Sequence, residues 1–286
     1  MICRKYFLIL AIFVLCTTSP IFAQTPEDDE VITVDTSLVN VPFSVSDREG
    51  RSILGLKAEN FTLFEDGKPI KIEYLSTQDN PLNVVLLLDT SQSSQDTFNK
   101  IKNAASEFIK QLGPNDKCMI VSFDSAARVK SEFTRNQKNL AKAIEKTILG
   151  VKPGTILRDA IFVLVDKELP KVKGRKAIIL ITDGKDAGSA IGEKDLLYRL
   201  AESDAPIYSI LYETIPAVVA ANPKNSSDKV KYDKKKLKQF QIAQQKKNEE
   251  AATFMEKMAD VTGGRSYRKE SGNLSEAFNT ITEELR

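Results

Sequence analysis

The chain has 286 residues, with 41 lysines and arginines against 39 aspartates and glutamates. Hydrophobic residues make up 42% of the sequence, which is enough to build a packed core in one large domain or two modest ones. There is no histidine, so a histidine general base, a Ser-His-Asp triad and a histidine-ligated metal are all excluded. Any chemistry must come from carboxylates, hydroxyls, amides or lysines.

The first 23 residues have the pattern of a secretory signal. Arg4 and Lys5 precede an apolar run at residues 6–16, and Ala23 supplies a small residue for cleavage. The run is shorter than the roughly 20 residues that a membrane-spanning helix needs, and no later segment could span a membrane either. We therefore expect export to the periplasm or the extracellular space, with no transmembrane segment.

Charge and cysteine content narrow the class of protein further. Loss of Arg4 and Lys5 with the signal leaves 39 basic residues against 39 acidic ones, a formal net charge of zero that gives no indication of nucleic-acid binding. Cys118 is the only cysteine after the signal, so no intrachain disulfide can form. It begins the apolar run 118–121, which predicts a small buried side chain and not a nucleophile.

Residues 24–80 are expected to form a small β module of four or five strands. Apolar residues alternate with polar ones from Val39 to Val45, as in a strand with one buried face. Asp66-Gly67 predicts a hairpin turn, and residues 56–60 have room for a single helical turn. The acidic segment 24–30 at the start of this region is expected to be disordered.

Residues 81–286 alternate between strand and helix patterns. Strands are predicted at 82–88, 119–123, 128–133, 177–181, 207–211 and 266–267, and helices at 98–112, 140–149, 156–169, 196–201, 253–261 and 274–285. The 128–133 strand is expected at an edge. This order predicts a doubly wound, mostly parallel open α/β sheet, in which ligands bind at the carboxyl ends of the strands.

Oxygen-bearing side chains gather at those strand ends. Asp89, Ser91 and Ser93 follow the first predicted strand, so that a carboxylate and two hydroxyls can point at one place. Thr155 opens a helix, and Asp183 follows the 177–181 strand. Each residue alone is typical of a turn or a helix cap, but together they form a set of hard oxygen ligands suited to Mg²⁺ or Mn²⁺.

This arrangement resembles the von Willebrand factor A-domain family, over about residues 81–286. The metal-ion-dependent adhesion site of that family has the form D-x-S-x-S, then a threonine, then an aspartate. The matching positions are Asp89, Ser91, Ser93, Thr155 and Asp183. The phrases at 154–160 and 262–264 are also similar to the family, and residues 65–69 resemble the module that precedes the A-domain in secreted bacterial VWFA-related proteins.

The resemblance implies a Rossmann-like fold that holds a divalent cation, usually Mg²⁺, with Mn²⁺ as the second candidate. Ser91 and Ser93 would be direct ligands, while Thr155 and the two aspartates would bind directly or through water. One position would be left for water or for an exposed Asp or Glu of a protein partner. The chain is thus expected to be a secreted, Mg²⁺-dependent, adhesion-type protein-binding module. Proximity to the motif assigns the partner-binding rim to Gln92, Ser94, Pro153, Ile156, Lys185 and Asp186.

A lysine-rich insertion is expected at about 215–248. Between Lys224 and Lys247 there are nine lysines against Asp228 and Asp233. This segment could bind an anionic surface, or it could be a solvated helix. It contains no arginine and only Tyr232 and Phe240 as aromatic residues, so it does not indicate nucleic-acid binding.

Two other classes of function stay open. The first is a metal-independent scaffold or assembly module of the cell envelope. The second is a phosphotransfer hydrolase with Asp89 as nucleophile, but haloacid-dehalogenase-type enzymes need a second aspartate two residues on, where this chain has Ser91. Neither a G-x-G-x-x-G motif nor a phosphate-binding P-loop is present, so catalysis is not expected.

Overall fold

The computed structural model describes residues 39, 41, 43, 45, 47, 48, 53, 55–75, 80–212, 234–269 and 274–285. The predicted signal at residues 1–23 and residues 215–233 of the predicted insertion lie outside this part of the chain.

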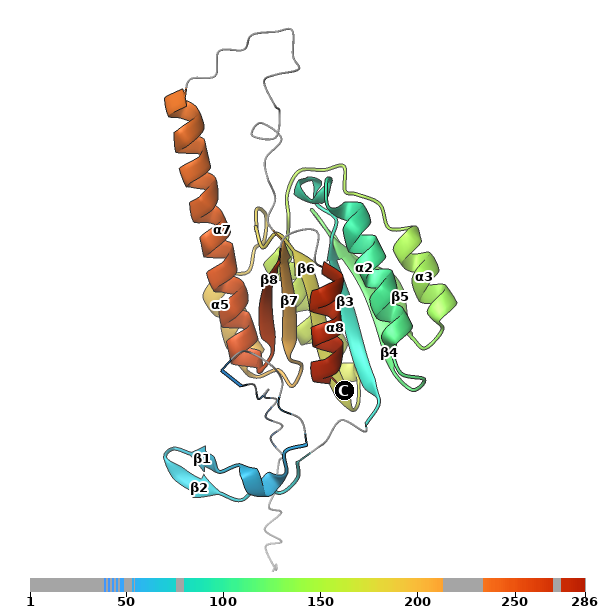
Figure 1. The fold of residues 1–286 in the computed structure, drawn as a ribbon, viewed down its shortest axis with the longest axis vertical. Helices are drawn as coiled ribbons and strands as arrows, with labels where there is room; N and C mark the ends of the chain where they lie inside the picture. Colours follow the sequence, from blue (N-terminus) through green and yellow to red (C-terminus); the bar gives the residue numbers. More distant parts are fainter. Residues whose placement is uncertain are drawn as a thin grey trace, which may run out of the picture. The chain divides into compact units, whose positions relative to one another are not determined.

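A six-stranded sheet forms the centre of the α/β domain, in the order β5-β4-β3-β6-β7-β8 (Figure 1). The strands are β3 (Leu82–Asp89), β4 (Lys117–Phe123), β5 (Ala127–Thr134), β6 (Arg175–Thr182), β7 (Ile207–Tyr212) and β8 (Arg265–Lys269). All neighbouring pairs are parallel except β4 and β5, and β5 lies at the edge. The predicted doubly wound, mostly parallel sheet is confirmed.

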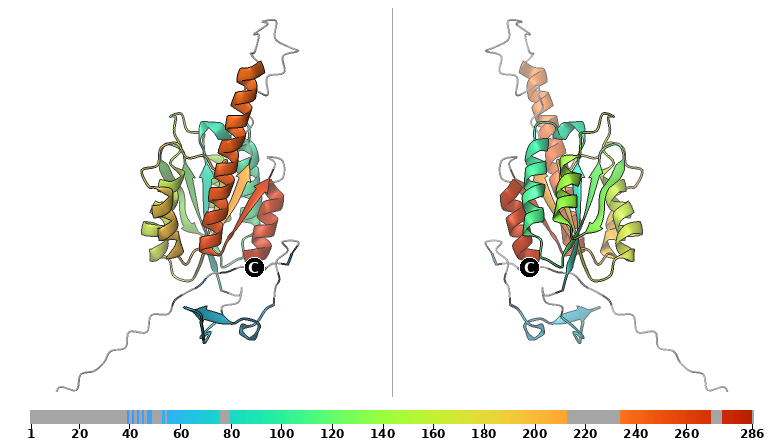
Figure 2. Two further views of the ribbon diagram at one scale, coloured as in Figure 1. Left: turned by 90° about the vertical axis from the view of Figure 1, so that its left-hand side faces the viewer. Right: turned by 90° about the vertical axis from the view of Figure 1, so that its right-hand side faces the viewer.

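Helices cover both faces of the sheet (Figure 2). One layer consists of α2 (Phe98–Gln111), α3 (Gln137–Glu145) and α8 (Leu274–Leu285). The other consists of α4 (Leu157–Val163), α5 (Glu193–Ala201) and α7 (Lys234–Thr262). The short helices are η2 (Gln92–Ser94), the π-helical η3 (Leu164–Glu168) and η4 (Leu169–Lys171).

The two core layers explain why β3 is continuously apolar from Val84 to Leu88. Val84 and Leu86 face the layer of α2, α3 and α8, and Val85 and Leu87 face the opposite layer; all four side chains are fully buried. A strand covered on both faces cannot alternate apolar with polar residues. Cys118 is also fully buried, and burial raises its pKa to about 12, in agreement with the prediction that it is not a nucleophile.

Helix α7 differs most from its predicted form. The apolar pattern predicted a helix only at 253–261, but α7 begins at Lys234 and has 29 residues. Among the helix side chains that the structure describes, the buried ones begin at Ala251. The preceding part has no buried apolar face, but it is rich in lysine and glutamine, which have good helix propensity. This part extends beyond the sheet (Figures 1 and 2) and exposes Lys238, Lys246 and Lys247, as a solvated helix does.

Helix α3 lies earlier in the chain than predicted, because it begins at Gln137 and not at Leu140. It ends at Glu145, and Thr147 then donates from its hydroxyl to the Ala143 carbonyl at 2.8 Å. Three residues further on, the Gly150 N–H donates to the Thr90 carbonyl at 2.7 Å. This hydrogen bond joins the loop before α4 to the end of β3.

The N-terminal region contains a hairpin. The strands β1 (Leu63–Glu65) and β2 (Lys68–Ile70) pair antiparallel around Asp66 and Gly67, which have φ values of 49° and 76°. The short helix η1 (Ala58–Asn60) confirms the predicted helical turn. The predicted strand around 39–45 is not formed in the described residues: Val39, Val41 and Phe43 lie outside any strand and are 76%, 53% and 50% exposed. Alternation alone does not supply the partner strand that a ladder needs.

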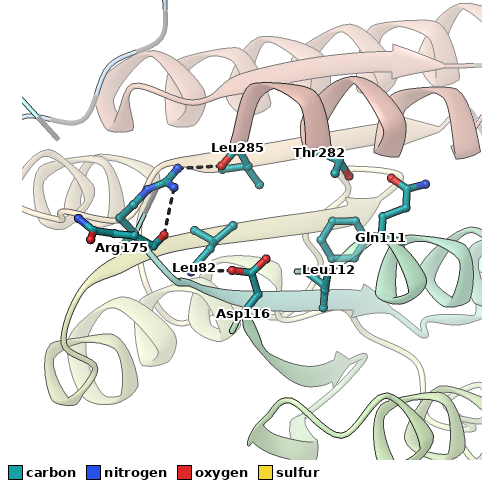
Figure 3. Close-up of a pocket in the computed structure, with 9 residues that line it drawn as sticks. Leu82, Gln111, Leu112, Asp116, Arg175, Thr282 and Leu285 are labelled. Carbon is teal, nitrogen blue, oxygen red and sulfur yellow. Dashed lines mark hydrogen bonds between the residues drawn. The ribbon is translucent and has the colours of Figure 1, made fainter. Parts of the chain in front are cut away.

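A small pocket lies at the amino-end edge of the sheet, between α2, α8 and the start of β3 (Figure 3). Arg175 donates to the Leu285 carbonyl at 2.8 Å and to the Asn80 carbonyl at 3.3 Å. Asp116 accepts from the Leu82 N–H at 2.9 Å. These polar groups join chain segments, so we assign the pocket a structural role.

Candidate metal centre

The carboxyl ends of β3 and β6 bring the predicted aspartates together. Leu88 pairs with Ile181, so Asp89 and Thr182 follow at the same level of the two strands. The Thr182 hydroxyl donates to Asp89 Oδ2 at 2.7 Å. Asp183 is the next residue, and it is 3% exposed. The parallel pairing of β3 and β6 is therefore what places the two carboxylates at one edge.

The chain that leaves β3 folds back over Asp89. The Ser91 N–H and hydroxyl both donate to Asp89 Oδ1, at 2.9 Å and 2.5 Å. The hydroxyl oxygens of Ser91 and Ser93 are 3.0 Å apart. Because Ser91 gives its proton to Asp89, lone pairs of its oxygen remain available to a cation. The D-x-S-x-S segment is thus folded so that its three oxygen-bearing side chains converge.

Asp89 is fully buried, and its surroundings shift its ionisation toward the uncharged form. Burial in the protein interior, followed by repulsion from Asp183, raises the pKa of Asp89 to about 6. Hydrogen bonds from Ser91 and Thr182 oppose this shift. A divalent cation would stabilise both carboxylates in their charged forms.

Thr155 lies at the same edge by virtue of backbone hydrogen bonds. It is 8% exposed and stands two residues before the start of α4. Its carbonyl accepts from the Ala187 N–H at 3.0 Å, and the Ile156 N–H donates to the Asp124 carbonyl at 2.8 Å. Among the described residues, no hydrogen bond joins the Thr155 side chain to the other four predicted ligands. Hydrogen bonds thus join Asp89, Ser91 and Ser93, and Asp183 lies close enough to Asp89 to repel its charge.

The donor set fits a hard divalent cation. It consists of two carboxylates and three hydroxyls, all oxygen ligands of the kind that Mg²⁺ prefers. Nowhere in the described part of the chain do three or more His, Cys, Asp or Glu side chains gather as a metal site, so carboxylates alone could not hold the ion. Asp124, at the end of β4, is 2.7 Å from Arg128 and is already neutralised.

The predicted rim residues have different environments. Gln92 and Pro153 are exposed, and Gln92 donates from Nε2 to the Val151 carbonyl at 3.3 Å. Ile156 is half-buried. Asp186 accepts from the Arg158 N–H at 2.9 Å and from Ser189, so it holds its own loop together.

Ser94 has no exposed surface, so the structure corrects its assignment to the rim. It lies under Asp89 because η2 turns its side chain inward, where it donates to Asp89 Oδ1 at 3.2 Å. Its oxygen is 2.7 Å from the hydroxyl of Tyr212, the last residue of β7. Because Ser94 donates to Asp89, Tyr212 is the donor in this pair.

Tyr212 and Thr182 are site residues that the sequence patterns did not indicate. Both end buried strands next to the metal motif, and that position is the signal that could have found them.

We expect Tyr212→Phe to weaken the hydrogen bonds that hold Ser94 against Asp89. Loss of the hydroxyl leaves buried Ser94 without its donor, which should lower stability by about 1 kcal/mol and weaken Mg²⁺ binding several-fold. Tyr208→Phe, which removes a buried hydroxyl earlier on the same strand, is the matched control. Calorimetric Mg²⁺ titrations of both variants check this, and equal Mg²⁺ affinities in the two would argue against the role of Tyr212.

Comparisons with known proteins agree with this fold. The sequence model of the von Willebrand factor type A domain matches residues 84–185, a segment that contains all five predicted ligands. A curated but uncharacterized protein of Synechocystis sp. is 30% identical over 110 residues, which are 37% of this chain. The match spans 26% of the length of that relative.

Solved structures share the fold at low sequence identity. The conserved hypothetical protein BatB from Bacteroides thetaiotaomicron has a TM-score of 0.52 and 21% identity, over 71% of this chain and 97% of that one. A von Willebrand factor type A protein from Catenulispora acidiphila gives 0.51 and 16%, over 72% and 42%. Proximal thread matrix protein 1 from the mussel byssus gives 0.53 and 12%, over 74% and 48%. Together these findings support a von Willebrand factor A-family domain with a Rossmann-like α/β fold.

Proposed function

We propose that this chain is an exported, Mg²⁺-dependent protein-binding module of the adhesion type. One observation carries the proposal: the buried carboxylates of Asp89 and Asp183 lie at one sheet edge with the hydroxyls of Ser91 and Ser93. The two carboxylates balance the charge of a divalent cation without exceeding it, and the hydroxyl ligands are neutral. The bound ion would therefore still attract an acidic side chain of a partner.

In this proposal Asp89, Ser91, Ser93, Thr155 and Asp183 hold the cation, which supplies a positive centre for a partner's Asp or Glu. Ser91 and Ser93 present oxygen atoms, and Thr182 and Ser94 keep the Asp89 carboxylate in place. Mn²⁺ has similar ligand preferences and could replace Mg²⁺.

The surface beside the site suits contact with a protein. Val151 is 84% exposed and Ile148 is 71% exposed, although their loop is fixed to β3 through Gly150. With Gln92 and Pro153 they give the rim both apolar and polar groups. We expect the partner's acidic residue to have apolar neighbours.

Export is proposed from the signal-like pattern that ends at Ala23. In the part of the chain that the structure describes, no helix combines the length and apolar character needed to cross a membrane.

We propose no catalytic role for Asp89. A nucleophile needs access to its substrate, but Asp89 has no exposed surface and both of its carboxylate oxygens accept hydrogen bonds. A partner that binds through the metal would contact the ion and not the Asp89 carboxylate.

Selection from a displayed random-peptide library tests the proposed function. In Mg²⁺ we expect enrichment of peptides that contain Asp or Glu beside large apolar residues, and EDTA should release them. Enriched peptides that lack an acid, or that stay bound in EDTA, would instead favour the metal-independent scaffold.

A further inference from the structure

We propose that Lys185 is a built-in competitor of the metal ion: its ammonium group neutralises Asp183 and lowers the affinity of the site for a cation alone. The proposal rests on the metal site described above and assigns a regulatory role to a residue that motif proximity placed only on the rim.

Lys185 contacts both oxygens of the Asp183 carboxylate. Its Nζ is 3.2 Å from Oδ2, and its backbone N–H donates to Oδ1 at 3.2 Å. The Asp183 side chain is 1% exposed and that of Lys185 is 24% exposed, so water screens this pair weakly. A cation that binds Asp183 must share the carboxylate with the ammonium group or displace it.

The backbone makes this contact a fixed feature of the turn. Gly184 has a φ of 75°, which returns the chain toward Asp183. There is no room for a side chain at this position: a Cβ would lie 2.8 Å from both the Ala251 Cβ of α7 and the Leu211 Cδ1 of β7. The packing of α7 and β7 therefore requires glycine between Asp183 and Lys185, and with it this tight turn.

The charge of Lys185 should lower the affinity of the site for the metal ion and raise the affinity of the occupied site for an acidic partner. Asp89 and Asp183 carry two negative charges, and Lys185 offsets one of them. A divalent cation then meets a less negative site and binds more weakly. Once it has bound, however, the site keeps a net positive charge, which favours a partner's carboxylate. Lys185 thus makes occupancy by the metal depend on the presence of an acidic partner, a coupling that acts in both directions.

Neutral replacement of Lys185 tests the proposal with metal ions alone. For Lys185→Gln and Lys185→Met we expect the Kd for Mg²⁺, measured by calorimetry, to fall roughly tenfold. The melting temperature in EDTA should fall as well, since two buried carboxylates lose their counter-charge. Lys185→Arg keeps the charge and should keep the Kd within about threefold of the parent chain.

Lys152→Gln is the matched control, because Lys152 is exposed in the neighbouring loop and the change in net charge is the same. It should alter the Kd by less than about twofold. If the parent chain binds Mg²⁺ and the neutral Lys185 variants bind it no better, the competitor role is overturned while the metal site stands. If only the neutral variants bind, the competitor role is supported; if none binds Mg²⁺ or Mn²⁺, both proposals fail.

Discussion

Asp89→Asn should abolish the thermal response to Mg²⁺ and, in EDTA at pH 7, make the chain more stable than its parent. The carboxylate is fully buried, and its pKa is raised to about 6 by burial and by Asp183. Asparagine has nearly the same shape and carries no charge, so the folded state no longer holds a desolvated anion. We expect a gain on the order of 1–2 kcal/mol, after allowance for weaker hydrogen bonds to Ser91 and Thr182.

The pH dependence of the stability difference between Asp89→Asn and its parent provides a further check. A carboxyl group whose pKa is higher in the folded state contributes stability below its unfolded pKa, here about 3.8, and loses it as the pH rises through about 6. The stability difference between variant and parent in EDTA should therefore be small near pH 4 and complete above pH 6. Melts across this range measure it, and a variant that is less stable at pH 7 would show that Asp89 stabilises the fold as an anion.

Gly264→Ala should produce the largest loss of stability. A Cβ at this position would lie 2.1 Å from the carbonyl oxygen of Ile207 and 2.6 Å from its carbonyl carbon. These are backbone atoms of β7, which pairs with β8 immediately after Gly264, so they cannot move without loss of that pairing. We expect a loss of more than about 3 kcal/mol, or a fall in melting temperature on the order of 10 °C.

Gly188→Ala is the control for this substitution, because its Cβ would meet the Ile156 Cγ2 at 3.4 Å, an ordinary contact. Its melting temperature should stay within a few degrees of the parent value. Equal effects of the two changes would mean that the close approach at Gly264 is readily relieved. Differential scanning calorimetry distinguishes these results.

The sequence predicts the sheet well because its strands are buried on both faces. The apolar runs of β3 and β6 are not expected in a strand that faces solvent. Each of these strands ends in a polar residue of the candidate site. Their alternation with helices then predicts that the sheet is mostly parallel. The extension of α7 could not be predicted, because residues 234–248 have helix-forming composition without an apolar face to mark them.

The sequence predicts the candidate metal ligands but not the residues that hold those ligands in place. Spacing identifies Asp89 and Asp183 because both follow strands, whereas the inward turn of Ser94 depends on η2 and on Tyr212, more than a hundred residues away. The requirement for glycine between Asp183 and Lys185 likewise comes from Ala251 and Leu211, which leave no room for a side chain at Gly184. Such contacts follow from packing between distant segments, which no local pattern records.

Titration of the purified chain with Mg²⁺ and Mn²⁺ by calorimetry tests the central claim most directly. We predict saturable binding of one ion per chain, together with stabilisation of roughly 2.7 kcal/mol when free metal is a hundredfold above its Kd. Absence of binding by either ion at millimolar concentration, in the parent chain and in Lys185→Gln alike, would contradict a metal centre at Asp89, Ser91, Ser93, Thr155 and Asp183.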